Sequence, residues 1–240
     1  MPILFFNTGY LIFILPALLL ALFAQWKISS TYRKYSEIRN AQGLTGADVA
    51  RVLMRNEGLD YVGVEVIPGN LTDHYDPRTK TMRLSAGSSQ APSVAAMAVV
   101  AHELGHAQQD KQGYFWLQLR SGIVGIANIG SNFGIILVFI GLMLGAAGGR
   151  GGFGWTLAWA GVLLMASAVF FSLITLPVEL NASARAREML ARNGLVTTQE
   201  AQSVSSILNA AALTYIAAAA QAVLQLLYFV TLLAGGNRRN

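Results

Sequence analysis

Residues 155–183 read WTLAWAGVLLMASAVFFSLITLPVELNAS, and this stretch decides the class of fold. Its first part, about residues 155–176, contains no charged residue and is long enough for a helix that crosses a hydrocarbon core of about 30 Å. The apolar part ends at Pro177, and Glu179 follows two positions later. Because a carboxylate at the edge of a bilayer needs a partner, Glu179 is a candidate functional residue.

Three further apolar segments are long enough to span, at about residues 5–26, 123–147 and 207–233. Hydrophobic residues make up 54% of the 240 residues and charged residues only 12%, about half the share in an ordinary soluble domain. We therefore predict a mainly α integral membrane protein with about four transmembrane helices. Small residues in these segments suit close helix–helix contact, among them Gly125, Gly130, Gly134 and Gly141.

The basic residues predict an orientation. The alternative that the first segment is a signal peptide is disfavoured, because no Lys or Arg precedes it and no A-x-A site precedes Lys27. The end of this segment carries a basic cluster, Lys27, Arg33, Lys34 and Arg39. The positive-inside rule then places residues 27–120 in the cytoplasm, with three basic residues outside: Arg150, Arg238 and Arg239.

The polar segment of residues 27–120 predicts a small α+β portion. A short amphipathic helix should begin after Thr45 and end at Gly58. VGVEVIPG and TKTMRLS alternate as strands do, and LTDHYDP is expected as the loop between them. A helix of small residues should follow, with Pro92 in its first turn and its end near Asp110.

That last helix contains HELGH at residues 102–106. The spacing of four puts His102 and His106 on one helix face, where both imidazoles can bind one zinc ion. Glu103 points elsewhere and can act on water as a general base. Random placement of only three histidines would give this pattern in roughly one sequence in a thousand. The alternative is a pair of structural histidines, but a glutamate between them would then be costly to bury.

A catalytic zinc site usually has a third protein ligand. The extended motif with a third histidine is absent, since Gln109 and Gln112 stand where it would continue. Asp110 should point along the helix axis, away from the ion. Glu179 is the remaining candidate, although it could instead pair with Arg185 as an interfacial glutamate.

The LTDHYDP motif allows two interpretations. His74 or Tyr75 may be read as a donor that stabilises the oxyanion of a hydrolytic intermediate. Asp73 and Asp76 are better interpreted as structural residues that cap a turn. Tyr215, in the fourth apolar segment, is a second candidate donor, with packing as its alternative role.

Four blocks in this order resemble the YugP-like zinc metallopeptidases of bacterial membranes: LTGADVARVL, LTDHYDPRTKTMRLS, AHELGHAQQ and LPVELNAS. More distantly, the chain is similar to membrane gluzincins of the HtpX and CAAX prenyl protease type. The resemblance implies a single Zn²⁺ held by His102, His106 and Glu179, with Glu103 as the base. In those relatives an aspartate four residues after the glutamate bonds a ligand histidine. Ser183 occupies that position here, so Ser183 or Asn181 is expected to replace it.

The resemblance also implies a membrane-embedded endopeptidase of the bacterial cytoplasmic membrane, multi-pass, with a zincin-like segment at residues 27–120 and a ligand helix and linker at residues 177–202. Substrate is expected along a strand that precedes the zinc helix, here residues Thr81, Met82, Arg83, Leu84 and Ser85. Expected partners are the lipid bilayer and a membrane-associated protein or peptide substrate, while homo- or hetero-oligomerisation stays open.

Other functions receive less support. The alternative is a zinc-binding scaffold or chaperone-like protein without turnover, which would favour a fourth ligand such as His74 over water. A transporter would need charges within the spans, and only Glu179 and Arg120 lie at their ends. The net charge of +5 follows from basic residues beside the spans, and no basic–aromatic pattern predicts nucleic-acid binding. The absence of cysteine excludes thiolate ligands.

Overall fold

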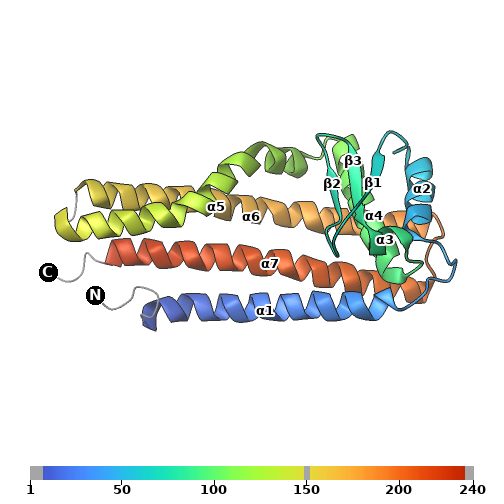
Figure 1. The fold of residues 1–240 in the computed structure, drawn as a ribbon, viewed down its shortest axis with the longest axis horizontal. Helices are drawn as coiled ribbons and strands as arrows, with labels where there is room; N and C mark the ends of the chain where they lie inside the picture. Colours follow the sequence, from blue (N-terminus) through green and yellow to red (C-terminus); the bar gives the residue numbers. More distant parts are fainter. Residues whose placement is uncertain (1–7, 149–151, 236–240) are drawn as a thin grey trace. The chain divides into compact units, whose positions relative to one another are not determined.

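The computed structural model describes residues 8–148 and 152–235, so Arg150, Arg238 and Arg239 lie outside the described residues. Ten elements follow one another along the chain (Figure 1). In order they are α1 (Thr8–Ser36), α2 (Gly46–Glu57), β1 (Gly63–Ile67), β2 (His74–Asp76), β3 (Thr81–Ser85), α3 (Ala86–Gln90), α4 (Val94–Lys111), α5 (Phe115–Gly148), α6 (Phe153–Arg192) and α7 (Thr198–Gly235).

Four of the described helices, α1, α5, α6 and α7, are long and apolar enough to cross a membrane. The helices α5, α6 and α7 each contain one of the apolar segments found in the sequence, and α1 contains the described part of the first, from Thr8 onward. Together with the small three-stranded sheet, they confirm the predicted fold class, a mainly α membrane protein with a small α+β portion.

The chain divides into two compact units. The first, here called the helical unit, comprises Met1–Phe23, Leu119–Thr175 and Tyr215–Asn240. The second, the mixed unit, comprises Ala24–Gln118 and Leu176–Thr214. Both predicted ligand segments, HELGH and the stretch around Glu179, belong to the mixed unit.

Small residues bring α5 and α6 together in the helical unit. A Cβ added to Gly130 would lie 2.2 Å from the carbonyl oxygen of Leu164, and one added to Gly141 would lie 2.4 Å from the Ala158 nitrogen. A Cβ added to Gly134 would lie 2.6 Å from Cγ of Met165 and 3.0 Å from the carbonyl oxygen of Gly161, whereas one added to Gly125 meets no atom within 4 Å. Three of the four glycines singled out in the sequence therefore serve close helix contact.

The mixed unit contains the predicted short helix, α2. Thr45 caps α2 and forms a capping box with Asp48, and Gly58 ends the helix in the left-handed conformation at φ 63°. The apolar face of α2, including Val49 and Leu53, is fully buried in a core shared with α4. Ser93, and not the predicted Pro92, marks the start of α4: its side chain accepts from the backbone N–H of Ala96.

The sheet corrects one prediction, the loop expected at residues 74–76. Its strand order is β1-β3-β2, so β3 is the central strand, parallel to β1 and antiparallel to β2 (Figure 1). Residues 74–76, expected within a loop, form the edge strand β2, because His74, Tyr75 and Asp76 pair with Arg83, Met82 and Thr81. Met82 and Leu84 are fully buried in the core that contains α4.

The helix that carries Glu179 also differs from its prediction. The sequence suggested a separate ligand helix and linker at residues 177–202, after the third span. Instead, α6 runs without interruption through Pro177 to Arg192. Proline removes one helical hydrogen bond, and apolar spanning helices tolerate this loss. Glu179 is therefore held by the same helix that contains the third apolar segment.

Candidate metal centre

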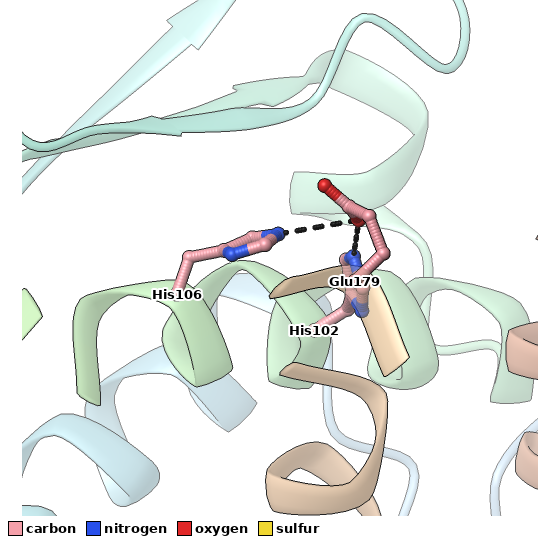
Figure 2. A group of neighbouring side chains, drawn as sticks. All are labelled: His102, His106 and Glu179. Carbon is pink, nitrogen blue, oxygen red and sulfur yellow. Dashed lines mark hydrogen bonds and ion pairs between the residues drawn. The ribbon is translucent and has the colours of Figure 1, made fainter. Parts of the chain in front are cut away.

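The two histidines of HELGH lie one turn apart on α4 and face the same side. Their ring centroids are 4.9 Å apart, and the rings are nearly perpendicular at 82°. Figure 2 shows both imidazoles rising from α4 toward the carboxylate of Glu179, which comes from α6. Glu179 Oε2 lies 3.2 Å from His102 Nε2 and 3.5 Å from His106 Nε2.

A close crossing of α4 and α6 produces this arrangement. Gly105 lies between the two histidines in sequence, and a Cβ there would lie only 2.5 Å from the carbonyl oxygen of Ala182. The absence of a side chain at Gly105 lets α6 approach the histidine-bearing face. His102 and Glu179, 77 residues apart in sequence, thereby come into contact.

Glu103 is buried on α4 beside the two histidines, with 7% of its surface exposed. Burial raises the pKa of Glu103 to about 7, while the charge of His102 and a hydrogen bond from the Tyr75 backbone N–H act in the opposite direction. A carboxyl group with a pKa near neutrality can both take up a proton and return it.

The donor set fits a zinc ion. Among the described residues, one nitrogen each of His102 and His106 and one oxygen of Glu179 lie within 4.8 Å of one another. Two imidazoles and a carboxylate are ligands that zinc prefers, and three protein ligands leave a position for water or substrate. The Glu179 side chain is only 3% exposed, so this carboxylate has little access to bulk water as an alternative partner.

Comparison with known proteins agrees with this geometry. Residues 10–234 match a family described as "Putative neutral zinc metallopeptidase". The chain belongs to this zinc metallopeptidase family. It is also similar to a protein of Bacillus subtilis (strain 168) named "Putative membrane protease YugP", with 40% identity over 224 residues, covering 93% of this chain and 96% of that protein. No solved structure matches.

Each of the two HELGH histidines has a partner for its second ring nitrogen. Ser183 Oγ lies 3.3 Å from His102 Nδ1, at the position where distant relatives carry aspartate. Gln109 Oε1 lies 3.0 Å from His106 Nδ1. Asn181, expected to contact a histidine, instead accepts from Gln109 Nε2 at 3.0 Å.

The contact of Gln109 with His106 was not predicted, because Gln109 was noted only as a position where the extended motif with a third histidine does not continue. Its position three residues after His106 could have predicted the contact between the two side chains, because residues at this spacing on a helix are neighbours. The alternative partner of Glu179, Arg185, donates to the side chains of Asn181, Gln108 and Gln112.

The side chains of the LTDHYDP motif make hydrogen bonds within the mixed unit. Asp76 accepts from the backbone N–H of Arg78, as the capping interpretation predicts. Asp73 caps no local turn and instead accepts from Ser85 and Ser88, 12 and 15 residues further along the chain. The Tyr75 hydroxyl donates to Asp110 at 2.6 Å, and its role as an oxyanion donor stays a prediction.

His74 and Tyr215 stay predicted oxyanion donors. His74 is exposed on β2, and its Nδ1 lies 2.9 Å from the carbonyl oxygen of Thr72. Tyr215 lies on α7 in the helical unit.

The prediction that substrate binds along residues 81–85 is wrong. Residues 81–85 form β3, which pairs with β1 along its whole length and with β2 at Thr81, Met82 and Arg83. The remaining part is also occupied, since the backbone N–H of Ser85 donates to Asp73. A strand with neighbours on both sides cannot accept an added peptide strand. The edge strand on the side of α4 is β2.

Proposed function

We propose that this protein is a zinc-dependent endopeptidase that hydrolyses peptide bonds at the cytoplasmic surface of the membrane. The observation that carries the proposal is the meeting of His102, His106 and Glu179 at one point, with the buried carboxyl group of Glu103 beside them. Membership of a zinc metallopeptidase family and similarity to a membrane protease support it.

The residues have separate tasks in this proposal. His102, His106 and Glu179 would hold one zinc ion, which when bound supplies the Lewis acidity that activates water and polarises a carbonyl group. Glu103 takes a proton from the attacking water and returns it to the leaving amine. The backbone of Tyr75 lies near the Glu103 carboxylate and lowers its pKa, which partly offsets the effect of burial.

The open edge of β2 is the proposed binding strand for substrate. In the strand order β1-β3-β2, β2 pairs with β3 on one side only, and its residue Tyr75 has its backbone near Glu103. A peptide that extends the sheet at this edge would run past the general base. Because Glu179 follows the third apolar segment by only three residues, we expect substrates to be cytoplasmic loops of membrane proteins or misfolded segments near the bilayer.

The test compares zinc content and peptide hydrolysis of the detergent-purified protein with two variants. We expect wild type to bind about one zinc and to cleave a peptide. Glu103→Gln should keep the metal and lose activity, and Glu179→Gln should lose the metal. Glu188→Gln is the matched control, since Glu188 lies on α6 with a side chain 69% exposed and bonded to Arg192.

Two outcomes would reject the proposal. Zinc binding without any effect of Glu103→Gln on hydrolysis would attribute no proteolysis to this site and favour the scaffold alternative. If wild type binds no metal, zinc-dependent hydrolysis by this protein is rejected.

A further inference from the structure

Gln109 is a buried amide between the two helices that carry the metal site. Its exposed fraction is 0%, although it is polar. Its Oε1 faces His106 Nδ1 at 3.0 Å. Its Nε2 donates to the carbonyl oxygen of Val178 at 2.8 Å and to Oδ1 of Asn181 at 3.0 Å. Both amide hydrogens and the amide oxygen are therefore used.

The partner at Val178 determines which way this amide faces. A backbone carbonyl oxygen only accepts hydrogen bonds, so the NH₂ group of Gln109 must be the part that faces it. The amide oxygen then faces His106, and an oxygen only accepts. Nδ1 of His106 must consequently carry the hydrogen.

This hydrogen determines the state of the other ring nitrogen. A neutral imidazole with its hydrogen on Nδ1 has a free lone pair on Nε2, the nitrogen that faces Glu179. The orientation of such a ring is set by the bond at the opposite nitrogen. Gln109 therefore prepares Nε2 of His106 for a metal before the metal arrives.

The same amide also connects the two ligand helices. Val178 immediately precedes Glu179 on α6, and His106 lies on α4 three residues before Gln109. Asn181, its other acceptor, is held from the opposite side by Arg185 Nε at 2.7 Å. One side chain thus links a ligand histidine to the backbone beside the ligand carboxylate.

We infer that Gln109 is a positioning residue that fixes the tautomer of His106 and its placement relative to Glu179. The part of this inference that concerns zinc affinity rests on the proposed function. The part that concerns the tautomer does not need a metal.

The first measurement is zinc affinity by competition with a chelator, for wild type and Gln109→Leu. Loss of a partner to a ligand histidine should weaken zinc binding roughly 10–100-fold. The matched control is Gln108→Leu, the neighbouring glutamine, which donates to Glu57 and accepts from Arg185 without contacting a histidine. We expect the control to stay within about threefold of wild type, a change smaller than that of an affected ligand.

The second measurement uses the fact that the chain has only three histidines. Nitrogen NMR of the metal-free, histidine-labelled protein, at a pH where imidazole is neutral, reports which ring nitrogen carries the hydrogen. We expect His106, assigned by His106→Gln, to carry it on Nδ1 in wild type and to populate both tautomers in Gln109→Leu.

The outcomes separate this inference from the proposed function. Zinc affinity of Gln109→Leu equal to that of wild type, or a hydrogen on Nε2 of His106 in wild type, would overturn the inference. If Gln109→Leu fails to fold, the spectrum of wild type alone decides. Wild type that binds no zinc but carries the hydrogen on Nδ1 would reject the proposed function and leave the tautomer assignment standing.

Discussion

At the scale of single residues, the two ligand histidines are supported differently. His106 is held by a fully buried amide, whereas His102 contacts the hydroxyl of Ser183 at 3.3 Å. A hydroxyl both donates and accepts, so Ser183 can bond His102 Nδ1 whichever nitrogen of that ring is protonated. A serine therefore constrains the His102 tautomer less than an aspartate would.

Ser183→Ala should weaken zinc binding modestly. Removal of one neutral hydrogen bond costs about 1 kcal/mol, which corresponds to roughly a fivefold change in affinity. Chelator competition measures the change. Ser206→Ala is the control, because Ser206 is exposed on α7 and bonds only to the carbonyl of Gln202. An unchanged affinity of Ser183→Ala would show that the contact with His102 is not used in the metal-bound protein.

At the scale of elements, the crossing of α4 and α6 depends on one glycine. Gly105→Ala would place a Cβ 2.5 Å from the Ala182 carbonyl oxygen, and backbone atoms cannot move aside as a flexible side chain can. We expect a loss of stability of about 1–3 kcal/mol from overpacking. Zinc affinity should fall as well, because α6 carries Glu179.

Thermal unfolding in detergent, together with chelator competition, tests this expectation. Gly125→Ala is the control, since Gly125 lies in α5 and no atom lies within 4 Å of its added Cβ. The same change there should be neutral or slightly stabilising, because alanine favours helix over glycine. Equal behaviour of the two variants would mean that α4 and α6 adjust to the extra methyl group.

The end of α2 is joined to α4 and α6 by Glu57. This carboxylate accepts from Arg192 at 2.6 Å, Asn193 at 3.0 Å and Gln108 at 3.2 Å. Burial opposes its ionisation, but the hydrogen bonds from Arg192 and Asn193 outweigh burial and hold the pKa of Glu57 below its ordinary 4.5. The ionised form therefore stabilises the fold.

Glu57→Gln should lower the free energy of unfolding by about 1 kcal/mol near neutral pH. A lowered pKa in the folded state gives stability that is present above the unfolded pKa and lost as pH falls through the folded one. The difference between wild type and Glu57→Gln should therefore shrink below about pH 4.5. Denaturant unfolding across this pH range measures the difference in the free energy of unfolding. A difference that does not change with pH would mean that the packing of the side chain, and not its charge, stabilises the fold.

The elements also show how far the sequence could predict this fold. Apolar length located the four long helices, and capping residues located α2. The strand β2 was missed because it follows Asp73 and ends at Asp76, and aspartates favour turns. Pairing with β3 outweighs this local preference. Strand order was missed because alternation along a strand says nothing about which strand is central.

The whole molecule explains which parts of the site could be predicted. Helix geometry alone brings His102 and His106 together, so their role could be inferred from spacing. Glu179 contacts His102 from 77 residues away, and the charge at the end of an apolar segment was the only local sign of it. The roles of Gln109 and Asn181 depend on the approach of α6 to α4, which no local pattern encodes.

The last prediction concerns the orientation of the molecule in the membrane. The basic residues of the sequence predict that the mixed unit lies in the cytoplasm, and that the turn before α6 lies outside. Since the chain contains no cysteine, a single introduced cysteine reports the side of the membrane on which it lies.

Asp60→Cys, at an exposed position in the mixed unit, should react with a membrane-impermeant maleimide only after protoplasts are opened. Phe153→Cys, at a position 76% exposed at the start of α6, should react in intact protoplasts. Reaction of Asp60→Cys in intact protoplasts would move the proposed peptidase site to the outer surface, where its substrates would be extracellular segments.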